Sequence, residues 1–198
     1  MMLRFFLVTA FFVFTAFFAE AQRFRMTAQY SMAQPLGTFN DYYPSYSGRG
    51  GHFSLEYFIM PEQLSVSLTA GVNDFKLQTS IGTGPGGNIP IGTSTKVFPM
   101  MVQANYYLPL DWALKPYVGL GGGQYYFTEE VFVGYDKEEI NEGSYFGFVP
   151  ELGFYHSLTE TIELNLGFRY NHVFVEGENL QFLQFNFGLA YRFVKYQY

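Results

Sequence analysis

The sequence predicts an all-β protein, an eight-stranded antiparallel transmembrane β-barrel whose strands follow one another as an up-and-down meander. Three observations lead to this prediction. Large apolar residues alternate with small polar ones through most of the chain, and tight connections alternate with long ones. The composition is the third: aromatic residues make up 21% of the chain and charged residues only 14%, against about 25% charged residues in a typical soluble protein.

The alternation is clearest from Ile162 to Phe174. Every second residue there is large and mostly apolar, whereas the residues between them are polar or small as far as Asn171. A period of two predicts a β-strand, because successive side chains leave opposite faces of the pleat. At ~3.3 Å per residue this row is ~40 Å long, which spans a bilayer core of ~30 Å when the strand is tilted by ~45°.

Seven further segments carry the same pattern. Pro99 and Pro150 fall inside two of them and predict a bulge or a local break, because proline cannot donate a ladder hydrogen bond. The run Gly121 to Gly123 leaves the facing of the fifth strand open beyond Leu120. In chain order, the strands are predicted at about 24–33, 52–59, 64–74, 97–108, 116–128, 144–157, 162–174 and 183–193.

Most of these strands are supported by an apolar row of their own. The first two rows are Phe24, Met26, Ala28, Tyr30 and Met32 in the strand at 24–33, and Phe53, Leu55, Tyr57 and Ile59 in the strand at 52–59. The next two are Leu64, Val66, Leu68, Ala70 and Val72 in the strand at 64–74, and Phe98, Met100, Val102, Ala104, Tyr106 and Leu108 in the strand at 97–108. The strand at 144–157 has Phe146, Phe148, Leu152 and Phe154, and the strand at 183–193 has Leu183, Phe185, Phe187, Leu189, Tyr191 and Phe193.

Short and long connections alternate along the chain, a pattern typical of outer-membrane barrels, whose turns face the periplasm and whose loops face outside. The long loops are rich in Gly, Pro, Ser, Thr and Asn, and we expect them to be mobile and without a core of their own. The short connections lie at 60–63, 109–115 and around Thr159, the long ones at 34–51, 75–96 and 129–143, and a short fourth outer turn at Glu176 to Asn179.

The last hairpin also predicts a register. With the short fourth outer turn, Arg169 lies opposite Asn186, and Glu163 lies opposite Arg192. This register matches polar with polar and apolar with apolar residues, which a one-residue slip would destroy. Glu163 and Arg192 are therefore expected to form an ion pair near the periplasmic end of the lumen.

The short connection before this hairpin predicts a second pair. A three-residue inner turn, Thr159 to Thr161, places Leu158 opposite Ile162. Counting along the two strands then sets Glu151 opposite Arg169. These two residues are expected to meet in the middle of the lumen.

The apolar face is predicted to face lipid. The opposite face carries small or uncharged polar residues, which suit a lumen that eight strands leave just wide enough for packed side chains. A soluble lipocalin-like barrel is the alternative, and it would cover its outside with Lys, Glu and Asp, which are scarce in these strands. Tyrosines towards the strand ends are expected to form the aromatic girdles of the membrane interfaces: Tyr30, Tyr106, Tyr107, Tyr170 and Tyr191.

Residues 1–21 are predicted to be a cleaved signal peptide, and residues 22–198 the barrel. Arg4 is the only charged residue before the apolar run from Phe5 to Phe18. That run is too short for a transmembrane helix and is typical of a signal peptide. Ala19-Glu20-Ala21 is a small-x-small cleavage site, so cleavage is expected directly after it. A retained membrane anchor is the alternative.

The chain resembles the small OmpA/OmpX-type family of outer-membrane β-barrels from about Gln22 to Phe193. The resemblance rests on the eight-strand rhythm, the signal segment, the stretch Pro116-Tyr117-Val118-Gly119-Leu120-Gly121-Gly122-Gly123 and the end Gly188-Leu189-Ala190-Tyr191-Arg192-Phe193. It implies a non-catalytic, monomeric protein of the bacterial cell outer membrane. It also implies membrane lipid, lipopolysaccharide and the barrel-insertion machinery as partners. That machinery reads a terminal aromatic residue, for which Phe193 and Tyr198 both qualify.

Six charged residues of the predicted inward face form the candidate site. We expect a structural network in which the buried charges are neutralised by pairing, because an eight-stranded barrel is normally filled. A proton path or a gated pore is the functional alternative. The six residues are Arg25, Glu56, Glu151, Glu163, Arg169 and Arg192.

Composition argues against several other classes of function. The chain has no cysteine, so it forms no disulfide and no thiolate metal site. Its formal net charge of −6 argues against a nucleic-acid partner, which needs a basic face. The three histidines lack metal-ligand spacing, and no cofactor is expected.

His52 and Ser54 are the one weak catalytic motif. A lipid A deacylase of the barrel type uses a His-x-Ser pair with a carboxylate, but both residues here have lumen parity and no acid partner is evident. The acidic cluster at 129–142 indicates either a cation-dependent contact with lipopolysaccharide or a basic partner, or a solvated loop. The expected function is therefore a structural or surface-interaction role with the outer loops as binding surface. A lipid-modifying enzyme and a narrow channel are the alternatives.

Overall fold

The computed structural model describes residues 23–43, 46–76, 80–84, 87–110, 112–133, 136–177 and 179–193. They form one antiparallel sheet and a short helix. Among these residues, no helix is long and apolar enough to cross a membrane. The elements are β1 Phe24–Leu36, α2 Thr38–Tyr42, β2 Ser47–Met60, β3 Leu64–Lys76, β4 Ser80–Gly84, β5 Gly87–Tyr107, β6 Leu114–Val133, β7 Asp136–Ser157, β8 Ile162–Phe174 and β9 Asn179–Arg192.

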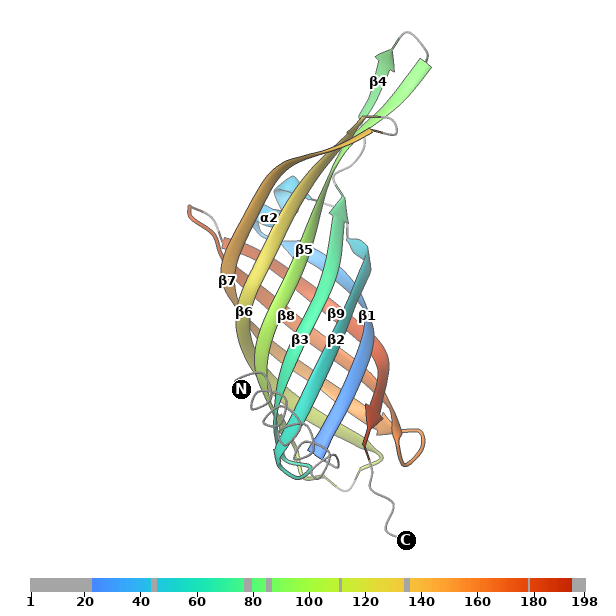
Figure 1. Cartoon of the computed structure of the whole chain (residues 1–198), viewed down its shortest axis with the longest axis vertical. Helices are drawn as coiled ribbons and strands as arrows, with labels where there is room; N and C mark the ends of the chain where they lie inside the picture. Colours follow the sequence, from blue (N-terminus) through green and yellow to red (C-terminus); the bar gives the residue numbers. More distant parts are fainter. Residues whose placement is uncertain are drawn as a thin grey trace, which may run out of the picture.

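The sheet closes into a barrel. Neighbouring strands are hydrogen-bonded in the order β3-β2-β1-β9-β8-β7-β6-β5-β4, and β3 also pairs with β5. This additional pairing closes a ring of eight strands and leaves β4 outside it, bonded to β5 (Figure 1). Closure gives every strand of the ring two neighbours, which backbone groups need in lipid. The predicted eight-stranded antiparallel meander is confirmed.

Two of the three long connections, which the sequence pattern predicted as loops between strands, are largely strand. β4 and the start of β5 form a hairpin, and β6 and β7 stay paired out to Val133 opposite Asp136. In Figure 1 these strands project beyond the barrel at one end, which we call the outer end; the turns that follow β2 and β7 lie at the inner end. Ladder pairing satisfies backbone N–H and C=O groups even where Gly and Ser predominate.

The first long connection folds inward and has a core, contrary to expectation. Phe39 of α2 packs against Phe75 and Phe182, with ring centroids 5.0 and 6.2 Å away. All three side chains are buried. They belong to an apolar plug in the outer part of the lumen, made of Ala33, Phe39, Tyr43, Phe75, Val97, Met101, Tyr125, Phe127, Val149, Val173 and Phe182.

The two faces of the barrel wall are arranged as predicted. Large apolar side chains such as Leu68, Leu120 and Phe168 are exposed on the outside, whereas Asn165 and Gln184 are buried inside. A transmembrane barrel requires this arrangement, because its lipid-facing band is apolar and its interior polar.

The three glycines of β6 do not change its facing. Beyond Gly123 the alternation continues, with Tyr125 buried inside and Tyr126 exposed outside. A Cβ on Gly123 would collide with the backbone of Met100 on β5. Glycine is therefore needed here for the close approach of two strands.

Pro99 and Pro150 each interrupt one ladder without shifting its register. The β3–β5 ladder passes from Ala70 opposite Met100 to Asn73 opposite Val97, so the pairs around Pro99 drop out. The β7–β8 ladder skips Val149 and Pro150 in the same way. The predicted local break is confirmed at both prolines.

The predicted register of the last hairpin is wrong by two residues. Arg169 lies opposite Gln184, and Glu163 opposite Ala190. The turn begins one residue earlier than predicted, directly after Phe174, and this moves every partner on β9 by two positions. Every side chain keeps its predicted face, because the side-chain period is also two. The turn contains Gly177 at φ 92°, a conformation that glycine adopts without a steric penalty.

Two predictions concern residues outside the described part of the chain. These are the signal peptide at 1–21 and the terminal Tyr198. The described chain ends at Phe193, whose backbone N–H donates to the Phe24 carbonyl at 3.2 Å.

Candidate functional site in the barrel lumen

All six predicted charged residues lie in or at the lumen, on the inner side of the apolar plug. Arg192 is partly exposed at the inner end, and the other five are buried, with at most 3% of each residue exposed. They form an inner group around Arg25 and a middle group around Arg169.

Arg25 of β1 is the centre of the inner group. Its Nε donates to Glu56 Oε2 at 2.8 Å, and its Nη1 donates to Glu163 Oε2 at 3.0 Å. Its Nη2 donates to the Tyr107 hydroxyl, and its Cζ lies 3.6 Å from the ring centroid of Tyr155. The guanidinium thus meets carboxylates along its edge and an aromatic ring on its face, which a lysine ammonium does not reproduce.

A chain of charged groups connects the inner group to the surface. Arg192 contacts Glu163 at 2.9 Å, so these two residues form the predicted ion pair although the register differs. Arg192 also contacts Glu62 at 3.4 Å, and Lys115 contacts Glu62 at 3.3 Å. Lys115 lowers the pKa of the Glu62 carboxyl, and Arg192 adds to this shift. The Glu62 side chain is 63% exposed, so solvent screens its contacts and they contribute little to stability.

Glu151 and Arg169 form the middle group. They lie opposite each other in the β7–β8 ladder, as predicted, and Arg169 Nε donates to Glu151 Oε2 at 2.7 Å. The same carboxylate accepts hydrogen bonds from the Tyr117 hydroxyl and Gln103 Nε2, both at 2.6 Å. Three donors therefore offset the loss of hydration of this buried charge.

The network is formally neutral, because it contains three arginines and three glutamates. Buried charges are tolerated when they are paired and when their remaining hydrogen-bonding positions are filled. Removing Arg169 would leave Glu151 buried without a counter-charge, so this pair is expected to be strongly coupled.

A double-mutant cycle tests the middle pair. Arg169→Ala is expected to lower the free energy of unfolding in urea by about 2 kcal/mol, roughly half of the usual cost of breaking a buried pair, because Gln103 and Tyr117 still serve Glu151. Adding Glu151→Ala should recover part of this loss. Additive effects of the two substitutions would contradict the coupling.

His52 is bonded to side-chain amides rather than to an acid. Its Nε2 lies 2.6 Å from Gln184 Nε2 and 3.4 Å from Asn73 Nδ2. Amide nitrogens are donors, so this geometry assigns Nε2 as the acceptor. Ser54 is also buried in the lumen. No hydrogen bond joins His52 to Ser54 or to a carboxylate in the described part of the chain.

The prediction that Tyr107 belongs to an aromatic girdle is wrong. Its side chain is buried in the lumen, where its ring packs against those of Tyr117 and Tyr155 at centroid distances of 5.4 and 6.1 Å. The alternation along the strand already indicated an inward position, because Tyr107 continues the inward row of Gln103 and Asn105. Tyr107 and Tyr155 line the guanidinium of Arg25, a role that the sequence pattern did not predict.

The acidic residues of the third long connection do not form one site, because their side chains have different environments. Glu129 accepts a hydrogen bond from the Tyr43 hydroxyl at 3.3 Å, Glu130 pairs with Lys96, and Glu142 is exposed. Burial raises the pKa of the Tyr43 hydroxyl. Within the described ranges, no three His, Asp or Glu side chains come together as a metal site would require.

A family model matches residues 5–193, and its description is outer membrane protein beta-barrel domain. A comparison with curated protein sequences gives no match.

Solved structures show the same fold at low sequence identity. Neisserial surface protein A is 17% identical, with a TM-score of 0.58 over 86% of this chain and 97% of that protein. OprG from Pseudomonas aeruginosa is 16% identical, with a TM-score of 0.54 over 87% and 96%. A major outer membrane protein from Thermus thermophilus is 13% identical, with a TM-score of 0.54 over 86% and 99%.

Proposed function

The chain belongs to the outer membrane protein β-barrel family, and on this premise we propose that it is a non-catalytic, monomeric barrel that displays a binding surface outside the cell. In this proposal the filled lumen stabilises the barrel, and the projecting parts of β4 to β7 are the surface that is free to bind.

The observation that carries the proposal is the filling of the lumen. The apolar plug occupies its outer part, the amides around His52 and Gln184 follow, and the groups around Arg169 and Arg25 fill the rest. An eight-stranded barrel has room for packed side chains only. This arrangement favours a structural lumen over a conducting one.

The site chemistry supports a role without catalysis. A nucleophile needs a base within hydrogen-bond reach, and the base needs a third group to orient it. His52 is instead hydrogen-bonded to Gln184 and Asn73. Glu151 is hydrogen-bonded to Arg169, Gln103 and Tyr117.

The projecting sheet supports a role in binding. β7 pairs with β8 only as far as Gly147 opposite Val173, so the outer part of β7 has β6 as its one neighbour among the described strands. Among the described strands, β4 pairs with β5 alone. Strand edges of this kind can accept an added strand from a partner.

Export and assembly complete the proposal. The segment 1–21 would direct secretion and be removed, so the mature chain would begin at Gln22. The barrel-insertion machinery would read Phe193 or Tyr198, and membrane lipid and lipopolysaccharide would surround the inserted barrel.

An epitope insertion tests the orientation. A tag inserted between β4 and β5 is expected to bind antibody on intact cells, because the long connections face outside. A matched tag after Glu62, in the turn between β2 and β3, should bind antibody only after the cells are permeabilised. Labelling of the second tag alone on intact cells would overturn the proposed surface.

Two measurements address the alternative functions. Purified folded protein in a planar bilayer is expected to give no conductance steps. Stable conductance steps would instead establish a channel.

Lipid A from cells with and without the protein should carry the same acyl chains. An acyl-chain mass shift that disappears in Ser54→Ala would establish an enzyme.

A further inference from the structure

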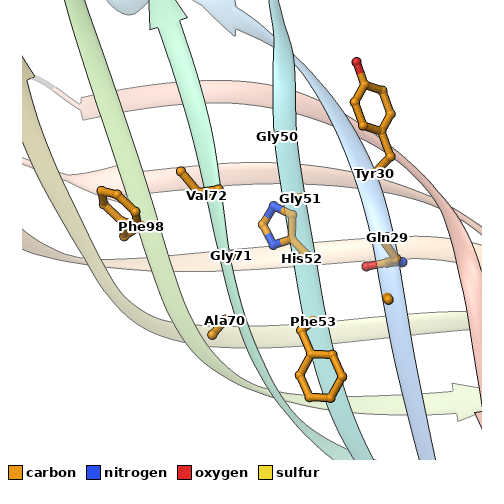
Figure 2. Close-up of a pocket in the computed structure, with 11 residues that line it drawn as sticks. Gln29, Tyr30, Gly50, Gly51, His52, Phe53, Ala70, Gly71, Val72 and Phe98 are labelled. Atoms are coloured by element: carbon orange, nitrogen blue, oxygen red, sulfur yellow. The ribbon is translucent and has the colours of Figure 1, made fainter.

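The outer face of the barrel wall contains a groove over β1, β2 and β3. Figure 2 shows its lining, with Phe53, Tyr30 and Phe98 around a floor of small residues. It is shallow and widely open, and its volume is about 700 Å³. Phe53 is 50% exposed, and Tyr30 and Phe98 are exposed as well, so the groove opens towards the lipid and not towards the lumen.

The groove results from small residues in rows where the barrel otherwise carries large ones. Gly51 lies between Tyr30 and Val72 in adjacent ladders. Ala28 and Ala70 lie on either side of Phe53 in the next row. By contrast, the corresponding row on the other side of the barrel is Leu152, Phe168 and Phe185.

The depth of the groove places it in the outer half of the membrane. At ~3.3 Å per residue and a tilt of ~40°, Phe53 lies ~18 Å above Met60 at the inner end. By the same estimate Arg49 lies ~28 Å above it, just beyond an apolar band that is ~25 Å tall. Arg49 is therefore at the level of lipid headgroups.

Basic residues gather above the groove although the chain as a whole is acidic. Arg49 on β2 and Lys76 on β3 are exposed, and Lys96 follows on β5. Two acids lie nearby. Glu130 pairs with Lys96, and Asp74, opposite Lys96 in the β3–β5 ladder, accepts a hydrogen bond from Ser94 but keeps its negative charge. The three basic and two acidic residues thus present one net positive charge to the headgroup layer.

We propose that this groove holds one acyl chain of a phosphorylated lipid of the outer leaflet, with the lipid phosphate against Arg49 and Lys76. The inference rests on the orientation given under the proposed function. An acyl chain fits an apolar groove that faces the bilayer core, and basic residues at the headgroup level bind anionic lipid. The Tyr30 hydroxyl donates to the Gly48 carbonyl, which holds the tyrosine ring at the edge of the groove.

Fluorescence quenching tests the proposal. The chain has a single tryptophan, so Trp112→Phe provides a silent background into which Phe53→Trp places a reporter in the groove. The matched control is Phe168→Trp, on β8 at a similar depth. Each protein is inserted into phosphatidylcholine vesicles that contain brominated phosphatidylglycerol or brominated phosphatidylcholine, and folding is verified by the mobility difference between unheated and boiled samples.

The groove reporter is expected to prefer phosphatidylglycerol by about fivefold, since one net positive charge near the surface contributes roughly 1 kcal/mol, which is a factor of about five. The control reporter should show no preference. Arg49→Gln with Lys76→Gln should abolish the preference, and Gly51→Leu should reduce it by filling the groove without changing the charge. If Phe53→Trp does not fold, Phe98→Trp on the opposite wall replaces it.

Two results would overturn the proposal. An equal preference at both reporters would show general electrostatic attraction, and a preference that survives in both Arg49→Gln/Lys76→Gln and Gly51→Leu would exclude the groove. Failure of the wild-type chain to insert at all would instead contradict the proposed membrane role, so the two failures are distinguishable.

Discussion

Arg25→Ala is expected to lower the free energy of unfolding by about 3–5 kcal/mol, the usual cost of removing one partner of a buried ion pair. Arg25 contacts both Glu56 and Glu163, each of which is only 2% exposed. Its removal would leave a cavity between aromatic rings. It would also deprive Glu56 of the one ion-pair partner that it has among the described residues, whereas Glu163 would keep Arg192.

The measurement is a urea titration of the folded barrel in detergent or lipid, followed by gel mobility. Arg25→Ala combined with Glu56→Gln should recover part of the loss, because a neutral amide needs no counter-charge. Arg192→Ala is the matched control: Arg192 is partly exposed at the inner end and Glu163 keeps Arg25 as its partner, so a loss of about 1 kcal/mol or less is expected. Equal losses for Arg25→Ala and Arg192→Ala would contradict the central role of Arg25.

The faces of the strands could be predicted from the sequence because the signal is local. Alternation assigns Phe168 to lipid and Arg169 to the lumen whatever the register between strands. The Glu151–Arg169 pairing was also predictable, since the inner turn between their strands is short and leaves few choices. Composition and alternation together therefore determined the fold class.

Features that depend on distant contacts could not be predicted in this way. The β8–β9 register depends on where the turn around Gly177 begins, and a turn moved by one residue preserves the apolar pattern. The burial of Phe39 depends on Phe75 and Phe182, which come from β3 and β9. Arg25 reaches Glu163 across 138 positions of the sequence, a separation about which local periodicity carries no information.

Phe168→Arg is expected to cost about 2–4 kcal/mol of stability, because arginine near the middle of the lipid-facing band is exposed to hydrocarbon. Phe168 lies between Leu152 and Phe185 in the cross-strand row and is exposed on the outer face. At ~3.3 Å per residue and a tilt of ~40°, it is ~15 Å above Ile162, near the centre of an apolar band ~25 Å tall.

Ile162→Arg is the control that separates depth from side-chain chemistry. Ile162 lies on the same strand and the same face with a similar exposed fraction, 39% against 42% for Phe168, but at the inner interface. The same substitution there should cost only about 0–1 kcal/mol, because the arginine head can reach water. The difference should appear as a lower urea midpoint for Phe168→Arg in lipid vesicles. Equal costs at the two positions would mean that this face of β8 does not cross a hydrocarbon layer, and would contradict the transmembrane placement of the barrel.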